Sequence, residues 1–161
     1  MSILRELGMQ ERGDKLKETF LYTLASCYVL CEKEISDTLA PHGLSPVKMN
    51  ALLVIKHIGK KRGIPQVEIC KKMVVTAGNM TGLVSRLRRQ KLVNRCVSSG
   101  DRRVNLIKIT KKGSDLLDKV WPVYKQEVDR VVSLPRKKIV AVVGALDGLR
   151  KKSFMAQKNN E

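Results

Sequence analysis

The chain has 161 residues, of which 43% are hydrophobic, so it is long enough for one domain with helical extensions and a core that needs no disulfide bonds. No stretch approaches the roughly 20 apolar residues of a transmembrane helix, and the first residues lack the apolar segment of a secretory signal, so we expect a cytoplasmic protein with no membrane partner. A net charge of +17, from 32 basic and 15 acidic residues, indicates a polyanionic partner instead.

Most of this positive charge lies in one third of the chain. Between Lys60 and Lys112 there are 15 basic residues against two acidic ones, Glu68 and Asp101, which is a net charge of +13. Charge that only keeps a protein soluble would be spread more evenly, and charge for membrane binding would follow one face of a long amphipathic helix. We therefore expect a nucleic acid as the partner.

The first predicted element is a helix over residues 15–40. Its apolar residues recur every three or four positions, which is the pattern of an amphipathic helix, and Pro41-His42-Gly43 ends it. The helix is too long for a small domain to cover, so part of its apolar stripe is expected to face a partner subunit. The stripe consists of Leu16, Phe20, Leu24, Cys27, Cys31 and Ile35.

The two cysteines of this stripe, Cys27 and Cys31, lie four residues apart and raise the alternative of a metal or thiol switch. Core packing is the favoured interpretation, because free cysteine behaves as a small hydrophobic residue and neither position has an acidifying motif beside it. Among the four cysteines of the chain there is no Cys-x-x-Cys pair, and neither histidine has a partner at metal spacing. No metal site and no cofactor are expected.

Three short helices are predicted next. Ser45 is expected to cap the first, with Pro46 at its first helical position. Pro65 begins the second, and Thr76 caps the third, which ends near Gln90. The residues expected to face the core are Met49, Leu52, Leu53 and Ile58 in the first of these helices, Ile69, Cys70 and Met73 in the second, and Met80, Leu83, Val84 and Leu87 in the third.

The opposite face of the helix over residues 77–90 is polar. Small residues near its N-terminal end permit close approach to a surface, and arginines near its C-terminal end can reach phosphates beside that surface. This face holds Gly78, Asn79, Thr81, Gly82, Ser85, Arg86, Arg88 and Arg89.

After Leu92 the hydrophobic pattern changes to a period of two, which predicts a hairpin over residues 93–110 whose tip is Gly100-Asp101-Arg102-Arg103. Thr110 and Gly113 then begin a long helix that Pro122 is expected to kink. Another helix starts at Ser133 and Pro135. The apolar positions of the last helix are Ile139, Val142, Val143, Leu146 and Leu149.

This order of helices followed by a basic hairpin is that of a winged helix-turn-helix, whose recognition helix enters the major groove while the wing reaches the adjacent minor groove. The expected fold is mainly α with a small β-hairpin wing. We predict a winged helix-turn-helix DNA-binding domain over residues 44–113. It lies between an N-terminal dimerisation helix (1–43) and C-terminal dimerisation helices with a polar tail (114–161).

The sequence resembles the MarR family, the multiple-antibiotic-resistance regulators. One departure is Lys91, where the family usually has glycine, and a left-handed lysine there would cost on the order of 1 kcal/mol. The resemblance rests on Leu44-Ser45, on Pro65-Gln66-Val67-Glu68-Ile69 before the recognition helix, and on Asp101-Arg102-Arg103 followed by Ile109-Thr110-Lys111-Lys112-Gly113.

The resemblance implies which residues bind DNA. Arg103 would be the wing-tip arginine in the minor groove, oriented by Asp101, and Arg102 would lie near phosphate. Narrow A·T-rich minor grooves concentrate negative potential, which is why an arginine suits that position. The predicted DNA-binding residues are Thr76, Gly78, Asn79, Met80, Thr81, Ser85, Arg86, Arg88, Arg89, Asp101, Arg102 and Arg103.

The predicted function is sequence-specific transcription regulation by a homodimer on pseudo-palindromic double-stranded DNA. By resemblance, a small molecule, often an aromatic acid, would bind between the dimerisation helices and the winged domain and release the operator, as in a repressor; its pocket residues are unknown. The alternatives are an RNA- or ribosome-associated winged-helix protein and a regulator that responds to thiol oxidation. No enzyme is expected, because no phosphate loop, nucleophile elbow or cluster of acids with a histidine is found.

Overall fold

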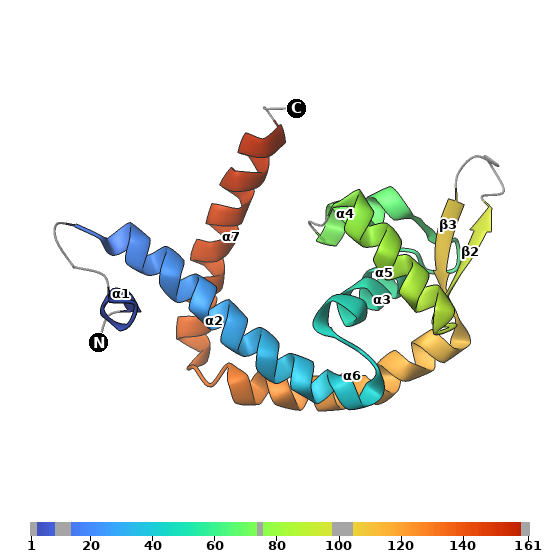
Figure 1. Cartoon of the computed structure of the whole chain (residues 1–161), viewed down its shortest axis with the longest axis horizontal. Helices are drawn as coiled ribbons and strands as arrows, with labels where there is room; N and C mark the ends of the chain where they lie inside the picture. Colours follow the sequence, from blue (N-terminus) through green and yellow to red (C-terminus); the bar gives the residue numbers. More distant parts are fainter. Residues whose placement is uncertain (1–2, 9–13, 74–75, 98–104, 159–161) are drawn as a thin grey trace. The chain divides into compact units, whose positions relative to one another are not determined.

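The computed structural model describes residues 3–8, 14–73, 76–97 and 105–158, which divide between two compact units, Met1–Val128 and Asp129–Glu161. The first unit holds α1 (Ile3–Glu6), α2 (Leu16–Leu39), the 3₁₀ turn η1 (Ala40–His42), α3 (Pro46–His57), β1 (Ile64–Pro65), α4 (Gln66–Met73), α5 (Ala77–Arg89), β2 (Val93–Val97) and β3 (Asn105–Ile109) (Figure 1). Helix α6 (Lys111–Val131) begins in the first unit and ends in the second, which also holds α7 (Arg136–Lys158). No helix in the described ranges is long and apolar enough to span a membrane.

The short helices begin where the sequence predicts them. Ser45 Oγ accepts a hydrogen bond from Lys48 N at 3.5 Å, and Thr76 Oγ1 accepts one from Asn79 N at 3.3 Å, so both N-caps are confirmed. Gly43, with a φ of 69°, ends η1 in the left-handed region that glycine adopts without strain. The predicted fold class, mainly α with a β-hairpin wing, is confirmed, whereas the boundaries at residues 43 and 113 stay a prediction.

The three strands form one antiparallel sheet in the order β1-β3-β2. The hairpin strands β2 and β3 pair with Val93 opposite Ile109, and β1 joins the other edge of β3 with Ile64 opposite Ile107. The sequence did not predict β1 or α1, because two and four residues are too few to show a period. The pairing of β1 with β3 places the start of α4 beside the wing.

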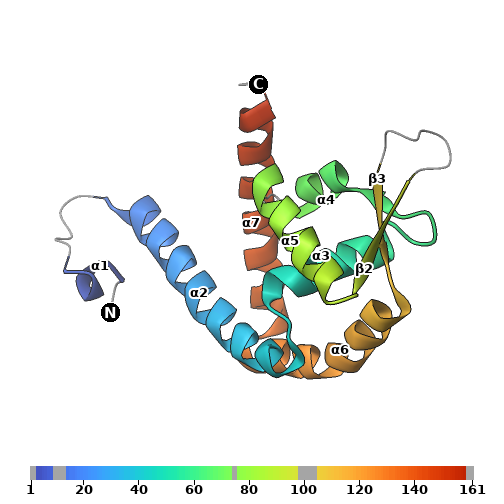
Figure 2. The same cartoon turned by 45° about the vertical axis from the view of Figure 1, so that its right-hand side comes forward.

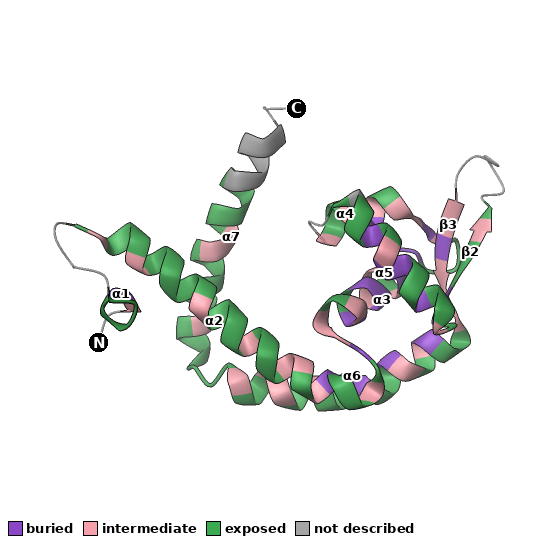
Figure 3. Cartoon of the chain, viewed as in Figure 1, coloured by how far each residue is buried: buried purple, intermediate pink, exposed green. Residues whose placement is uncertain are grey.

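The core of the first unit gathers the buried faces of α3 and α5 and the bases of the strands, as the purple segments of Figure 3 show. Most predicted core positions are confirmed there. Ile58 is an exception, since its side chain is 50% exposed; α3 ends at His57, and Ile55 takes the inward place with 0% exposure. The confirmed core residues are Met49, Leu52, Ile69, Met80, Leu83, Val84 and Leu87, with Leu53, Cys70 and Met73 partly buried against them.

Helix α2 leaves most of its apolar side chains on the surface. Leu16 is 73% exposed, and Leu39, at the C-terminal end, is the residue of this helix that is buried. The winged domain is too small to cover more than the C-terminal part of a 24-residue helix. For the same reason the core-packing interpretation of Cys27 is wrong, because Cys27 is exposed within the chain, while Cys31 is half-buried.

Candidate nucleic-acid interface

Helix α5 is anchored to the core along one face. Met80, Leu83, Val84 and Leu87 are at most 4% exposed, which fixes the rotation of the helix about its axis. The predicted DNA contact of Met80 is therefore wrong, because this side chain is 0% exposed and packs inside the domain. The other predicted DNA-binding residues of this segment are all exposed: Thr76, Gly78, Asn79, Thr81, Ser85, Arg86, Arg88 and Arg89.

Two side-chain hydrogen bonds hold the N-terminal part of α5. Thr76 caps the helix, and Gln66 Nε2, in the first turn of α4, donates to Thr81 Oγ1 at 2.8 Å. The bond between Gln66 and Thr81 joins the two helices of the helix-turn-helix directly and so helps to fix their angle. The sequence did not reveal this role of Gln66, because spacing along the chain does not report a contact between two different helices.

Two glycines, Gly78 and Gly82, keep the exposed face of α5 shallow. Neither has a left-handed φ, and no described atom lies within 4 Å of the position that a Cβ on Gly78 would occupy. At Gly82 the nearest atom would be Nη1 of Arg86 at 3.6 Å, an ordinary contact. Packing within the chain therefore requires neither glycine, although each costs about 0.5–1 kcal/mol in a helix relative to alanine. Because the two glycines destabilise the helix and are not needed for packing, the exposed face of α5 is suited to the close approach of another surface.

The C-terminal end of α5 is cationic and sharply capped. Lys91 N donates to Arg88 O at 2.8 Å and Leu92 N donates to Leu87 O at 3.0 Å, a capping motif that commonly has glycine in the left-handed position. Here Lys91 occupies that position with a φ of 60°. The turn thus forms despite the departure from the family pattern, at a cost of about 1 kcal/mol.

The base of the wing is tied to α5 and α6 by Thr110. Its hydroxyl donates to Lys91 O at 2.8 Å and accepts from Gly113 N at 3.0 Å, so it caps α6 and holds the end of α5 at the same time. A Cβ on Gly113 would collide with the main-chain oxygen of Leu92, so only glycine fits there. The Thr-x-x-Gly pattern noted in the sequence is explained by this junction.

The predicted wing-tip residues Asp101, Arg102 and Arg103 lie outside the described residues. What the structure describes is the stem that carries them. Strand β2 ends at Val97 and β3 begins at Asn105, and these two residues pair with each other at the end of the described stem.

Part of the positive charge between Lys60 and Lys112 lies on segments other than α5. Lys60, Lys61 and Arg62 are exposed in the turn between α3 and β1, which lies beside β3 (Figure 2). Lys112 Nζ donates to Gln90 O at 3.0 Å, so this lysine strengthens the α5–α6 junction. The net charge of this third of the chain therefore overstates the charge available on the recognition helix itself.

A hollow of about 420 Å³ lies on the exposed side of α5, lined by Gly78, Asn79, Gly82 and Arg86 together with Val47 of α3. A second cavity, of about 450 Å³, lies where α2, α3, α4 and α6 meet. Val47 lines both spaces. The sequence could not locate either space, since a cavity depends on how separate helices pack.

Helices α3 and α6 are joined by an ion pair. Lys56 Nζ lies 2.6 Å from Asp118 Oδ1, and this hydrogen bond lowers the pKa of Asp118 below its ordinary value. The pair holds the start of α6 against the winged domain. Because both side chains reach solvent, its contribution to stability is modest.

Known proteins that are similar to this chain share its fold, and they are transcriptional regulators. The sequence model of the MarR family matches residues 42–104, which span α3, α4, the recognition helix α5 and β2 and end just before β3. The HTH-type transcriptional regulator MhqR of Bacillus subtilis (strain 168) is 30% identical over 126 residues, covering 78% of this chain and 82% of that protein.

Solved structures also match along most of the chain. CouR from Rhodococcus jostii RHA1, bound to p-coumaroyl-CoA, superposes with a TM-score of 0.74 at 21% identity, covering 85% of this chain and 95% of that one. The transcriptional repressor CouR bound to a 23-mer DNA duplex gives a TM-score of 0.75 at 22% identity, covering 88% and 99%. At these identities the likeness establishes the fold.

Proposed function

The chain belongs to the MarR family of transcriptional regulators, and from this premise we propose how it works: as a cytoplasmic homodimer that binds pseudo-palindromic DNA and releases it when a small molecule binds. Family membership rests on the relative that is 30% identical over 78% of the chain and on the family match at residues 42–104. The relatives are regulators rather than enzymes, and we extend this to the present chain.

The observation that carries the proposal is the exposed face of α5. It is shallow at Gly78 and Gly82 for no reason of internal packing, and it becomes cationic toward Arg86, Arg88 and Arg89. A major groove admits a helix whose near side is small and polar, while arginines at the edge of that helix reach the phosphates. The wing-tip arginine Arg103 would contact the adjacent minor groove.

Dimerisation is proposed from the surface of α2 and α7. Along α2, side chains such as Leu21, Val29 and Leu30 are at least 59% exposed, and on α7 Val140 is 61% exposed and Val143 58%. Large apolar side chains at this density are uncommon on the surface of a monomer. A second copy of the chain is the proposed cover, because two recognition helices related by a twofold axis would match a palindromic site.

The effector site is proposed to be the cavity of about 450 Å³ where α2, α3, α4 and α6 meet. Its volume is within the range of small-molecule sites, and its wall includes apolar residues from three of these helices. CouR, with the same fold, is bound to p-coumaroyl-CoA in one structure and to DNA in another. The apolar part of the wall consists of Ile35, Pro46, Val47, Met49 and Met73.

Two lining residues connect this cavity to α5. Met73 is the last residue of α4, three positions before the cap Thr76, and Val47 also lines the hollow beside Gly78 and Asn79. A ligand that displaces either side chain would move the N-terminal end of α5. DNA and ligand would then weaken each other's binding by the same factor, as linkage requires.

The test uses a duplex selected from a random DNA pool by the wild-type protein. Its affinity is measured by fluorescence anisotropy at several salt concentrations, for wild type, Arg86→Ala and Arg103→Ala, with Lys137→Ala on α7 as the matched removal of one charge. We expect the first two variants to bind at least tenfold more weakly. Their log-log salt slope should be shallower by about 0.9 for each phosphate that the variant no longer neutralises. Lys137→Ala should bind like wild type.

Two results would refute this function. An equal decrease of affinity in all three variants would mean that only net charge matters and that α5 and the wing have no special role. Selection of a structured RNA over every duplex, with both pools offered at the same concentration, would favour the RNA- or ribosome-associated alternative.

A further inference from the structure

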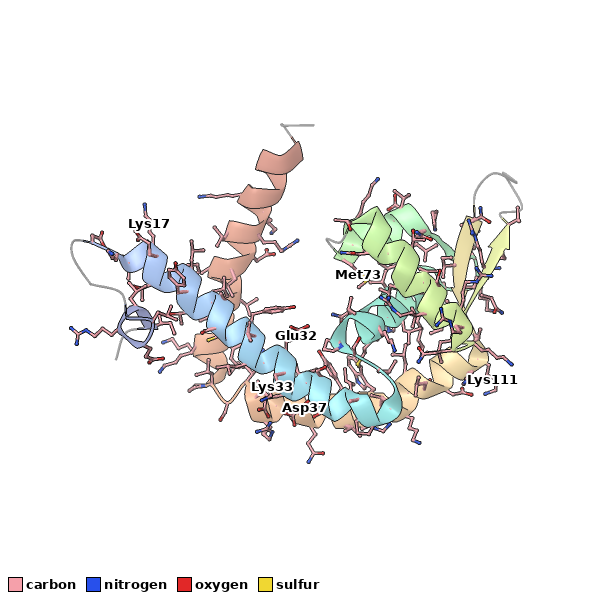
Figure 4. All side chains as sticks on the ribbon, in the orientation of Figure 1. Lys17, Glu32, Lys33, Asp37, Met73 and Lys111 are labelled. Atoms are coloured by element: carbon pink, nitrogen blue, oxygen red, sulfur yellow. The ribbon has the colours of Figure 1, made fainter. Side chains whose placement is uncertain are left out.

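The proposed effector cavity contains polar groups that the protein itself does not use. Tyr28 and Tyr124, Glu32 and Asn50 line it, from α2, α6 and α3. Among the described residues, no hydrogen bond or ion pair involves the side chain of any of these four. Figure 4 labels two of the residues that line the cavity, Glu32 on α2 and Met73 at the end of α4. These groups are therefore free to bind a ligand.

The charge of the wall has one sign. Glu32 is its only charged side chain, and among the described residues no lysine, arginine or histidine lines the cavity. In a chain with 32 basic and 15 acidic residues, a surface chosen at random would more often be basic. A carboxylate that accepts hydrogen bonds favours a ligand that donates them, and it repels a second carboxylate.

The rest of the wall is suited to an aromatic ring. Met49 is buried, Met73 is partly buried, and the rings of Tyr28 and Tyr124 belong to different helices, α2 and α6. Methionine sulfur and tyrosine rings both contact aromatic groups favourably. Tyr124 is itself held by a ring contact with Trp121, with centroids 5.6 Å apart, so its position does not depend on a ligand.

From this arrangement we infer that Glu32 determines the charge of the effector: the cavity prefers an uncharged or cationic aromatic compound that donates a hydrogen bond over an aromatic acid. This inference rests on the proposed function only for the location of the site. It changes the expectation drawn from the family, in which the effector was often an aromatic acid. Glu32 is exposed enough to be screened by water, so discrimination of about tenfold is expected rather than complete exclusion.

The experiment uses three compounds of similar size that differ in charge: 4-hydroxybenzyl alcohol, 4-hydroxybenzoate and tyramine. Binding to the full-length protein without DNA is measured by thermal shift and by calorimetry, for wild type and for Glu32→Gln. Glu18→Gln, the same charge change at another exposed position of α2 away from the cavity, is the matched control. In wild type the alcohol and the amine should bind at least tenfold more tightly than the acid.

In Glu32→Gln the acid should gain affinity and the amine should lose it, so that their ratio changes by at least tenfold, while Glu18→Gln keeps the wild-type order. The inference is overturned if wild type binds the acid as tightly as the alcohol, if Glu32→Gln leaves the order unchanged, or if none of the three compounds binds. Because these measurements contain no DNA, their outcome is independent of whether the chain binds an operator.

Discussion

The hydroxyl of Thr110 donates a hydrogen bond of 2.8 Å to the main-chain oxygen of Lys91, which joins the start of α6 to the end of α5. The same hydroxyl accepts from Gly113 N. Since β3 ends one residue before Thr110, this single side chain fixes the base of the wing relative to the recognition helix.

Replacing Thr110 with valine keeps the shape of the side chain and removes the hydrogen bonds of the hydroxyl to Lys91 O, Leu92 O and Gly113 N. We expect the free energy of unfolding to fall by about 1–3 kcal/mol, because Lys91 O and Gly113 N lose a partner at a half-buried position. Urea denaturation measures this change. Thr110→Ser keeps the hydroxyl and should retain most of the stability; a serine variant as unstable as the valine variant would show that the methyl group, not the hydroxyl, matters.

Gly78→Ala should change the stability of the protein and its affinity for DNA in opposite directions. Alanine has open space at this position and is the better helix former, so the free energy of unfolding should rise by about 0.5–1 kcal/mol. The same methyl group would stand between α5 and the floor of the groove, so affinity for the selected duplex should fall at least tenfold. Thermal unfolding and anisotropy on one preparation give both values. Unchanged DNA affinity in the more stable variant would mean that this face does not approach DNA closely.

The ion pair between Lys56 and Asp118 gives a pH dependence. The pKa of Asp118 is lower in the folded protein than in the unfolded chain, so the unfolded state binds more protons in acid. The stabilisation is present above the unfolded pKa and is lost as the pH falls through the folded value. We therefore expect the stability difference between wild type and Asp118→Asn to shrink as the pH is lowered from about 5 to about 3. A difference that stays constant over this range would contradict the assignment.

The signal is predicted to be a small molecule rather than oxidation. Cys27 is nevertheless exposed within the single chain, so this prediction needs a direct test. Cys27 and Cys31 are replaced together by alanine, folding is checked, and release of the selected duplex is measured with mild peroxide and with 4-hydroxybenzyl alcohol. Peroxide should release DNA from neither protein. If it releases DNA from wild type but not from the double variant, a thiol switch takes the place of the proposed effector.

Local signals in the sequence predicted the fold well. The caps Ser45 and Thr76, the glycine at position 43 and the three-four spacing of Met80, Leu83, Val84 and Leu87 each depend on a few adjacent residues, and each is found in the structure. The predicted burial of Ile58 was wrong because this residue, at the C-cap of α3, lies outside the face that Met49, Leu52 and Ile55 bury.

Features that depend on contacts between distant segments could not be predicted in this way. The strand β1 is defined only by its pairing with β3, the bond from Gln66 to Thr81 crosses between two helices, and the exposure of Cys27 reflects how little of α2 the domain covers. The cavity containing Glu32 is another such feature, since four helices build it. The sequence therefore indicated the recognition helix and, by resemblance, the region of the proposed effector site, but neither the residues of that pocket nor their charge.

The most direct test of DNA recognition by this chain is the ratio of two affinities at one salt concentration. Wild-type protein is titrated with the selected duplex and with a duplex of the same length and composition in scrambled order. A regulator that inserts α5 into the major groove should prefer the selected duplex by about 10³-fold or more, and footprinting should show two protected segments related by dyad symmetry about one helical turn apart. Equal affinity for the two duplexes, with uniform protection, would show that the protein binds any polyanion through its charge alone. That result would contradict the proposed function.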